Sequence, residues 1–145
     1  MPGAAVDVGF GTTIVFATTG FTANIVGPIT WSGVVRSALE TTHMSTAGPG
    51  ANQIGNRTFM PGDLVDPGTL TMPIHFNPNT NIPIHAVPET ITVSYPLVTG
   101  DATRANWACS GFITDVGSIT VEMDAVMTTT ITVKLTGPIT MTDAT

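Results

Sequence analysis

Positively charged residues are scarce in this chain. It has 145 residues, of which four are Lys or Arg and ten are Asp or Glu, so its formal net charge at neutral pH is −6. Tight binding to nucleic acid or to an anionic membrane needs several basic side chains on one face. Arg36, Arg57, Arg104 and Lys134 are too few and too widely separated in the sequence to make such a face. The charge balance therefore disfavours both kinds of binding.

Cysteine and long apolar runs are also nearly missing. Cys109 is the single cysteine, so no internal disulfide can form and nothing indicates an oxidising compartment. No run approaches the roughly twenty apolar residues of a membrane-spanning helix. Residues 1–7 lack the basic segment and the apolar run of a signal peptide. We therefore expect a protein that is made in a cytoplasm and has no membrane partner.

The reactive side chains do not fall into a catalytic or metal-binding pattern. His43, His75 and His85 lack the spacing of a zinc motif, and a single cysteine cannot complete one. Asp63 and Asp66 each lie beside a Pro-Gly pair, where Asp is expected to hydrogen-bond the turn backbone. The sequence contains no phosphate-binding loop, nucleophile elbow or catalytic-triad order. It therefore predicts no enzymatic activity, no bound metal and no cofactor.

Residues typical of β-sheets dominate instead. Roughly one residue in five is threonine, valine and isoleucine are plentiful, and eleven prolines and fifteen glycines are spread along the chain. Many short strands joined by turns have this composition. A chain of this length forms one domain and buries about 70% of the surface that it exposes when unfolded. We expect a single all-β domain over residues 1–145.

Alternation of apolar and polar residues indicates where the strands lie. The run 69–76 alternates regularly, and Pro73 within it indicates an edge strand or a bulge. Near the C-terminus, Ile131, Val133 and Leu135 are predicted to face the core. The opposite side carries a polar stripe suited to water or a wide aqueous lumen, made by Thr130, Thr132, Lys134 and Thr136. The other expected strands are 12–19, joined at Gly20 to 21–31, then 89–95, 104–116, and 119–136, which splits near Asp124.

The segment 32–40 has two interpretations. Ser32 can cap a short helix, although Gly33 and the two valines that follow it disfavour one. The alternative is a loop that leads into a strand over 39–44. The fold is therefore predicted to contain at most one short helix.

The segment 59–69 is predicted to form a rigid corner. It holds two Pro-Gly turns, Pro61-Gly62 and Pro67-Gly68, because Pro presets φ and Gly accepts positive φ. The residues between the two turns are too few for a strand of their own. The chain is expected to change direction here before it enters the strand 69–76.

A long polar loop precedes this corner. Residues 45–58 are rich in glycine and cannot bury enough apolar surface to order themselves. Compact domains seldom carry so long a loop without a use for it. We expect this loop to be mobile in a free subunit and to become ordered on a neighbouring one. Met44 and Met60 flank it and suggest an adaptable contact surface.

Several short motifs follow one another along nearly the whole chain. They are Gly11-Thr12-Thr13-Ile14, Phe21-Thr22-Ala23, Arg36 with Leu39-Glu40-Thr41-Thr42-His43-Met44, Pro61 to Gly68, Pro88-Glu89-Thr90-Ile91-Thr92, Ser110-Gly111-Phe112 and Thr136-Gly137-Pro138-Ile139-Thr140. In this order they resemble the major tail tube proteins of long-tailed, siphovirus-type bacteriophages. Each motif is weak alone, and their order gives the resemblance its specificity.

The resemblance implies a β-sandwich-like subunit that forms hexameric rings, which stack into a tube. One sheet of each subunit would join a ring-shaped β-barrel that lines the lumen. The implied partners are further copies of the chain, the tape-measure protein, tail terminator and tail-tip proteins, and DNA that passes without sequence-specific binding. The protein would belong to the virion tail and be assembled in the host bacterial cytoplasm. Such proteins usually pack a helix on the sandwich, whereas the corresponding segment here, 77–89, is rich in proline.

The resemblance also assigns contact regions. An N-terminal arm (1–11), the long loop (45–58) and a C-terminal tail (137–145) would make contacts within and between rings. The predicted contact residues are Met44, Ser45, Ile54, Asn56, Arg57, Phe59, Met60, Asp63 and Asp66. The predicted lumen-facing residues are Thr130, Thr132, Lys134 and Thr136.

Two other functions remain open at this point. The tube of a contractile or secretion-type injection machine shares the fold and the ring arrangement. A carbohydrate-binding or adhesin-like β-sandwich module would need exposed aromatic residues on one face, and Trp31, Trp107 and Tyr95 are few for that purpose.

Overall fold

The computed structural model describes residues 11–22, 24–43, 55–98 and 100–145. These residues contain strands, turns and extended connections without a helix, so none of them forms a helix that could span a membrane. The all-β prediction is confirmed, and the helical alternative for 32–40 is wrong because most of this segment pairs as a strand. The strands are β1 (Thr13–Phe16), β2 (Thr30–Trp31), β3 (Val35–Glu40), β4 (Phe59–Asp66), β5 (Thr69–His75), β6 (Glu89–Ser94), β7 (Asn106–Val116) and β8 (Thr128–Thr142).

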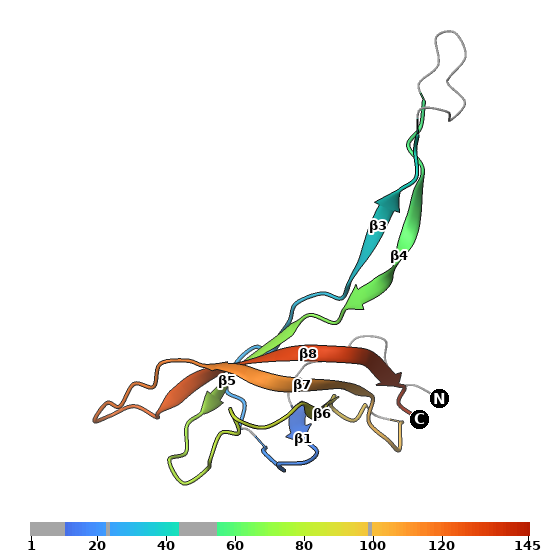
Figure 1. Cartoon of the computed structure of the whole chain (residues 1–145). Helices are drawn as coiled ribbons and strands as arrows, with labels where there is room; N and C mark the ends of the chain where they lie inside the picture. Colours follow the sequence, from blue (N-terminus) through green and yellow to red (C-terminus); the bar gives the residue numbers. More distant parts are fainter. Residues whose placement is uncertain (1–10, 23, 44–54, 99) are drawn as a thin grey trace. The chain divides into compact units, whose positions relative to one another are not determined.

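Six of these strands form one curled, antiparallel sheet. Its order is β1-β6-β7-β8-β5-β2, so the two longest strands, β7 and β8, lie in the middle (Figure 1). The other two strands pair only with each other. The chain accordingly divides into two compact units. Residues 1–33 together with 67–145 form the first, which we call the sheet unit, and residues 34–66 form the second, which we call the ribbon.

One face of the sheet is buried. Leu70, Met72, Ile131 and Val133 have no exposed surface, and they alternate along β5 and β8 with accessible polar residues. The predicted inward and outward faces of these strands are therefore confirmed. Burial of such side chains stabilises the fold by about 1.5–3 kcal/mol each.

The layer that covers this core is not a second sheet. Segments that connect the strands supply Phe21, Ile25, Ile29 and Ile82, which pack against the buried face. One sheet and a layer of extended connections thus enclose the core. The proline-rich segment 77–89 forms part of this layer and contains no strand before Glu89, as its prolines predict.

Pro73 occupies a position in β5 that tolerates proline. Its carbonyl oxygen accepts a hydrogen bond from the Val26 N–H, so the backbone nitrogen of Pro73 also faces that side and not β8. The neighbouring strand β2 contains only Thr30 and Trp31, so it ends before reaching this point. The missing N–H therefore removes no bond between β5 and β8. The prediction of an edge strand or a bulge is wrong, because β5 lies between β8 and β2 and pairs with β8 without a register shift.

The predicted hairpin at Gly20 is confirmed only in its turn. Gly20 has a φ of 68° and donates its N–H to the Phe16 carbonyl oxygen at 2.9 Å. Beyond the turn, Thr22 makes a single bridge to Val15. The second arm then becomes a connection that leads to β2, because its apolar residues cover the core instead of extending β1.

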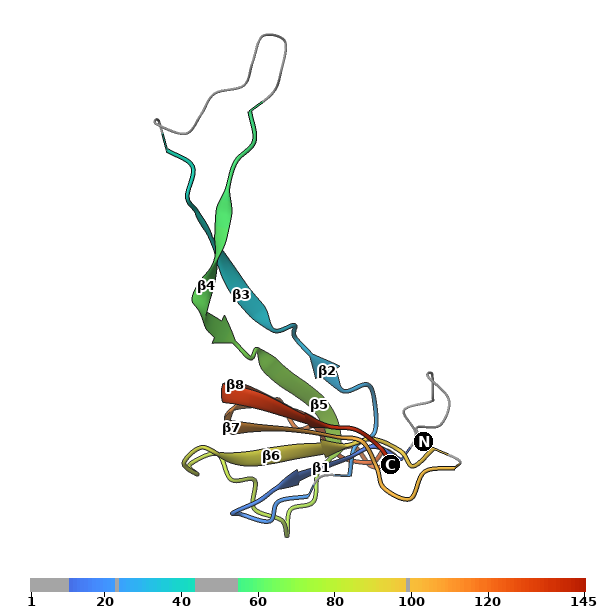
Figure 2. The same ribbon diagram turned by 90° about the vertical axis from the view of Figure 1, so that its right-hand side faces the viewer.

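The ribbon corrects the prediction of a rigid corner. Residues 59–66 form an eight-residue strand, β4, paired antiparallel with β3, and the two strands twist about each other in Figure 2. Pro61 lies opposite Ala38 beside a register shift that accommodates it. Gly62 leaves room for the Ser37 side chain and accepts a 2.6 Å hydrogen bond from Arg36 Nε at its carbonyl oxygen. Long-range pairing has overridden the local turn preference.

The second Pro-Gly pair lies in neither a turn nor a bend, although its glycine has the positive φ that was predicted. Gly68 has a φ of 90°, and a Cβ atom there would collide with the Ser32 carbonyl oxygen. Only glycine combines a positive φ with such a close approach. The turn predicted at this pair is therefore not formed, and these two residues alone separate β4 from β5.

The C-terminal segment 137–145 continues the sheet for most of its length. β8 extends to Thr142, which pairs with Asn106 at the end of β7. The N–H groups of Ala102 and Thr103 then donate to the Thr145 carbonyl oxygen. These residues are part of the sheet unit and do not form a separate tail.

Candidate functional site

The face of the sheet opposite the core is mainly polar, although Val15, Ala108 and Phe112 also lie on it. Paired residues of antiparallel strands share a face, so Thr132 of β8 lies beside Thr71 of β5, and Lys134 lies beside Thr69. The same face continues over β7, β6 and β1. Its hydroxyl-bearing residues are Thr13, Thr30, Thr69, Thr71, Thr90, Thr92, Ser94, Ser110, Thr130, Thr132 and Thr136.

This polar face contains all four residues predicted to line a lumen. Thr130 and Thr136 are exposed, and Thr132 and Lys134 are half-buried between neighbouring side chains. Lys134 lies opposite Phe112 of β7, and Asp115 lies opposite Thr132 at a bulge in β7. The face therefore offers many hydroxyl groups and little charge, which suits contact with water and weak contact with solutes.

A second candidate surface is apolar and lies on the ribbon. Leu64 is 83% exposed, and Val35, Phe59 and Val65 each expose more than half of their surface. These side chains lie on both faces of the ribbon, since Leu64 and Val65 are consecutive in β4. Exposed apolar side chains over a whole element mark protein contacts. The ribbon is therefore a candidate interface, and the sequence analysis identified part of it through Phe59 and Met60.

The other predicted contact residues are only partly covered by the structure. Asn56, Arg57 and Asp63 are exposed at the ribbon, and Arg57 Nε lies 3.7 Å from Glu40 Oε1 in a solvent-exposed ion pair. Asp66 is exposed at the end of β4. Outside the described residues lie Met44, Ser45 and Ile54, most of the loop 45–58 and most of the arm 1–11. The prediction that the loop becomes ordered on assembly stays a prediction.

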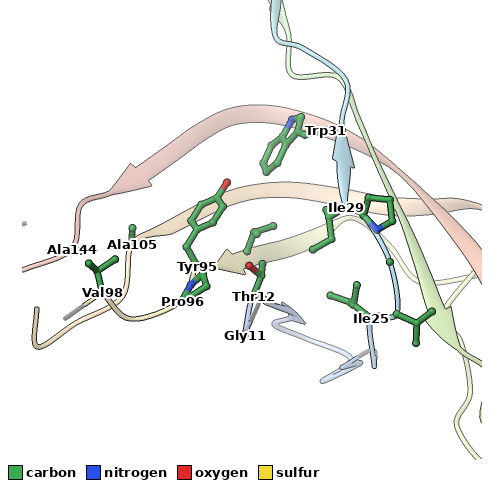
Figure 3. A pocket seen from close by; sticks show the side chains of 14 residues that line it. Gly11, Thr12, Ile25, Ile29, Trp31, Tyr95, Pro96, Val98, Ala105 and Ala144 are labelled. Carbon is green, nitrogen blue, oxygen red and sulfur yellow. The ribbon is translucent and has the colours of Figure 1, made fainter. Parts of the chain in front are cut away.

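A groove of about 940 Å³ opens in the sheet unit beside the buried face. We call it the Trp31 groove, and Figure 3 shows Ile25, Ile29, Trp31 and Tyr95 around it. Val93 and Val98 also line it, so its wall is largely apolar. Its chemistry suits an apolar side chain or ligand.

Aromatic contacts make the wall of this groove rigid. Trp31 and Trp107 meet edge to face with ring centroids 5.1 Å apart, and Tyr95 meets Trp107 at 6.2 Å. Trp31 Nε1 donates to the Pro67 carbonyl oxygen at 3.2 Å. Burial raises the pKa of the Tyr95 hydroxyl, which therefore stays protonated at neutral pH. The sequence analysis missed this groove because its lining comes from several distant segments.

Glu89 is a buried carboxylate that the sequence analysis also missed. It accepts hydrogen bonds from the N–H groups of Thr18 and Thr19, at 2.9 and 2.8 Å, and from the Thr19 hydroxyl at 2.7 Å. Burial acts to raise the pKa of this carboxyl, but the hydrogen bonds from Thr19 and Thr18 outweigh it and lower the pKa below its ordinary value. Glu89 thus fixes the turn that follows β1.

The side chains that carry reactive chemistry are dispersed. Within the described ranges, no three His, Cys, Asp or Glu residues gather as a metal site would require. His43, His75 and His85 are each exposed. Cys109 is buried, donates from Sγ to the Thr136 carbonyl oxygen at 3.4 Å, and has its thiol pKa raised by burial. It packs as a small apolar residue.

The chain is similar in structure to tube and tube-terminator components of contractile injection systems. The sheath/tube terminator of the extracellular contractile injection system PVC matches with a TM-score of 0.68 and 14% identity, over 96% of this chain and 97% of that one. The tube-terminating cap of the anti-feeding prophage matches with a TM-score of 0.68 and 16% identity, over 97% and 95%. A chain of the PVC sheath-tube complex matches with a TM-score of 0.63 and 16% identity, over 98% and 92%.

Sequence comparison adds no family assignment. No known family matches the chain, and no curated protein matches it significantly. The structural likeness, at 14–16% identity, therefore establishes the fold and extends over nearly the whole of both chains. It agrees with the tail-tube part of the resemblance but comes from contractile machines and not from long-tailed phages.

Proposed function

We propose that the chain is a structural subunit of a phage-tail-type tube, or of the ring that terminates one. The observation that carries this proposal is the likeness to tube and terminator proteins over at least 92% of both chains. The exposed apolar ribbon supports it independently, because a monomer gains nothing from exposing these side chains to water.

The proposed assembly uses the open sheet. The outer strands β1 and β2 end the sheet, and an outer strand presents N–H and C=O groups that can pair with another copy. Joining copies edge to edge would close a ring and turn equivalent faces toward one axis. The ring is a hexamer in this proposal, following the resemblance to tail tubes.

The polar face would line the lumen of this ring. It presents threonine and serine hydroxyls with Lys134 among them, and six subunits together carry a net charge of −36 (6 × −6). The wall itself carries little charge, and the net negative charge of the ring as a whole disfavours adhesion of a polyanion such as DNA. The lumen would thus guide DNA, or a tape-measure protein during assembly, without holding it, and the protein would act without catalysis.

The structural neighbours favour a contractile machine over a long flexible tail. The PVC and anti-feeding-prophage chains include two that terminate tubes, and both of these reach a TM-score of 0.68. We accordingly propose two candidate roles for the chain: a subunit of the tube itself, or a subunit of the ring that terminates it. In either role the partners would be further copies of the chain and the tube, terminator or tip proteins that adjoin it, within a tail-like particle.

The carbohydrate-binding alternative has less support. Such modules present aromatic rings as a flat, exposed platform. Here Trp31, Trp107 and Tyr95 meet edge to face and pack against the core. They are therefore occupied in stabilising the sheet unit.

Negative-stain electron microscopy of the purified protein tests the proposal. Six-fold rings or hollow tubes are the expected result at concentrations up to the millimolar range. Tubes would indicate a tube subunit, and single rings that never polymerise would indicate a terminator. A protein that remains monomeric at every concentration would contradict the proposal.

A further inference from the structure

An exposed apolar loop connects the two central strands of the sheet. Residues 117–127 join β7 to β8, and we call them the β7–β8 loop. Its base is held firmly, since the Gly117 N–H donates to the Thr130 carbonyl oxygen and Thr129 Oγ1 donates to the Gly117 carbonyl oxygen. Its tip turns at Met123 and Asp124. The base of the loop is thus fixed to the sheet unit.

The side chains at this tip are unusually apolar for their exposure. Met123 is fully exposed, at 105%, and Val121 and Val126 expose 74% and 68% of their surface. Turns are normally polar, and exposed apolar side chains in a group mark a contact. Methionine in particular adapts its shape to irregular apolar cavities.

One end of the Trp31 groove lies at the other end of the same strands, while its opposite wall, Ile25 to Trp31, runs along β5. Asn106 of β7 pairs with Thr142 of β8 at that end of the strands, and the adjoining Ala105 and Ala144 line the groove. At the opposite end, Val116 pairs with Ile131 and the loop begins. In Figure 1 the loop and the C-terminus accordingly lie at opposite ends of β7 and β8. Eleven residues of β7 separate the two ends by roughly 35 Å.

We propose that the β7–β8 loop of one copy inserts its tip into the Trp31 groove of a copy in the next ring. This contact is heterologous, because it joins two different surfaces of the same chain. When the two contacting surfaces lie at opposite ends of a subunit, a heterologous contact does not close into a ring. Each added copy leaves a free surface for the next one, so the assembly grows along one direction. The inference rests on the proposed function, and it adds the contact through which one ring stacks on another.

The chemistry of the two surfaces matches. The groove of about 940 Å³ has Trp31, Tyr95 and Val98 in its wall, which can receive Met123 and its apolar neighbours. Association would therefore remove apolar surface on both sides from water.

A local charge contact can orient the inserted loop. Arg104 Nη1 lies 3.2 Å from the carbonyl oxygen of Gly11, a residue that lines the groove. The loop tip carries Glu122 and Asp124, so it can bring a carboxylate to this guanidinium. Two acids lie at the same end of the sheet, Asp143 and Asp101, whose N–H donates to the carbonyl oxygen of the groove residue Val98. The attraction is therefore confined to Arg104, these acids oppose it, and the apolar contact contributes most.

Disulfide crosslinking tests the contact. A chain with Met123→Cys and Val98→Cys should form, under mild oxidation of the assembled protein, a ladder of dimers, trimers and longer species. The matched control carries Leu64→Cys with Val98→Cys, because Leu64 is also highly exposed but belongs to the ribbon. The control should give no such ladder.

A substitution that leaves folding intact tests whether the Met123 side chain stabilises the stacking of rings. Met123→Asp should abolish stacking while rings still form, since Met123 makes no buried contact within its own chain. Met123→Leu should stack normally. Two results would overturn the inference: normal tubes of the Met123→Cys, Val98→Cys chain that give no crosslinked ladder, or tubes of normal length formed by Met123→Asp. The groove would then have another occupant, such as residues 1–10. A chain that never forms rings would instead contradict the proposed function together with this inference.

Discussion

At the scale of single residues, Glu89 has a larger structural role than its position at the start of β6 suggests. Its two carboxylate oxygens accept three hydrogen bonds from Thr18 and Thr19, about seventy positions earlier in the chain. Hydrogen bonds to a charged group contribute about 1.5–3 kcal/mol and leave unsatisfied donors when the charge is removed. Glu89 therefore ties the turn after β1 to β6.

We predict that Glu89→Gln lowers the free energy of unfolding at neutral pH by about 1–3 kcal/mol. The amide keeps the shape of the side chain but cannot accept at both of its polar atoms. Chemical denaturation followed by circular dichroism measures this change. An exposed acid changed in the same way, such as Asp115→Asn, is the control and should alter stability by less than about 0.5 kcal/mol.

The pH dependence of the same variant has a definite sign. The pKa of Glu89 is lower in the folded state, so its stabilising contribution is complete above the ordinary glutamate pKa of about 4.3 and is lost as the pH falls through the folded value. The stability difference between the native protein and Glu89→Gln should therefore shrink below pH 4. A difference that stays constant down to pH 2 would contradict this account.

At the scale of elements, the ribbon is separable from the sheet that carries the core. The chain enters and leaves it at Ser32 and Thr69, where the Ser32 N–H donates to the Thr69 carbonyl oxygen and the Thr69 N–H donates to Ser32 Oγ. None of the most deeply buried core side chains belongs to the ribbon in the part of the chain that the structure describes. Its residues thus contribute little to the stability of the sheet unit.

We predict that replacing residues 34–66 by Asn-Gly leaves the sheet unit folded and abolishes ring formation. Together with Gly33, Pro67 and Gly68, the inserted Asn-Gly makes a five-residue loop between Ser32 and Thr69. This is a common length for a hairpin, and it would connect strands that are already paired at this point. The far-ultraviolet dichroism spectrum should retain its β character, and the thermal midpoint should stay within a few degrees. Electron microscopy should then show no rings. Normal tubes from the shortened chain would exclude a role for the ribbon in assembly.

At the scale of the whole molecule, charge opposes the proposed assembly while apolar surface favours it. Each copy carries −6, so copies that approach one another repel at long range. The exposed side chains of the ribbon and of the β7–β8 loop attract only at contact. The balance between these two effects depends on ionic strength.

We predict that assembly becomes several-fold faster between about 0.01 M and about 0.1 M salt. Over this range the Debye length falls from about 30 to about 10 Å, which screens repulsion between subunits but leaves apolar contacts intact. Light scattering after a jump in salt concentration measures the rate. Slower assembly at higher salt would mean that complementary charges, such as Arg104 with the loop carboxylates, dominate the encounter.

The parts of the fold that were predicted from sequence are those with a local signal. The runs 69–76, 89–95 and 104–116 match β5, β6 and β7 closely because alternation depends only on neighbouring residues. The polar stripe on β8 was found for the same reason. The strand β4 was missed because Pro61-Gly62 favours a turn locally, and only pairing with β3 makes this segment extended.

The sequence by itself determined the all-β class, the residues that enter the core, and the polar character of the opposite face. Each of these follows from composition and from a period of two along a strand. Only the tertiary structure decided that β8 lies between β5 and β7, that Glu89 reaches Thr18 and Thr19, and that Trp31 and Tyr95 border one groove. The physical reason is that strand order and such contacts join distant segments, whose pairing depends on the free energy of the whole chain and leaves no local pattern.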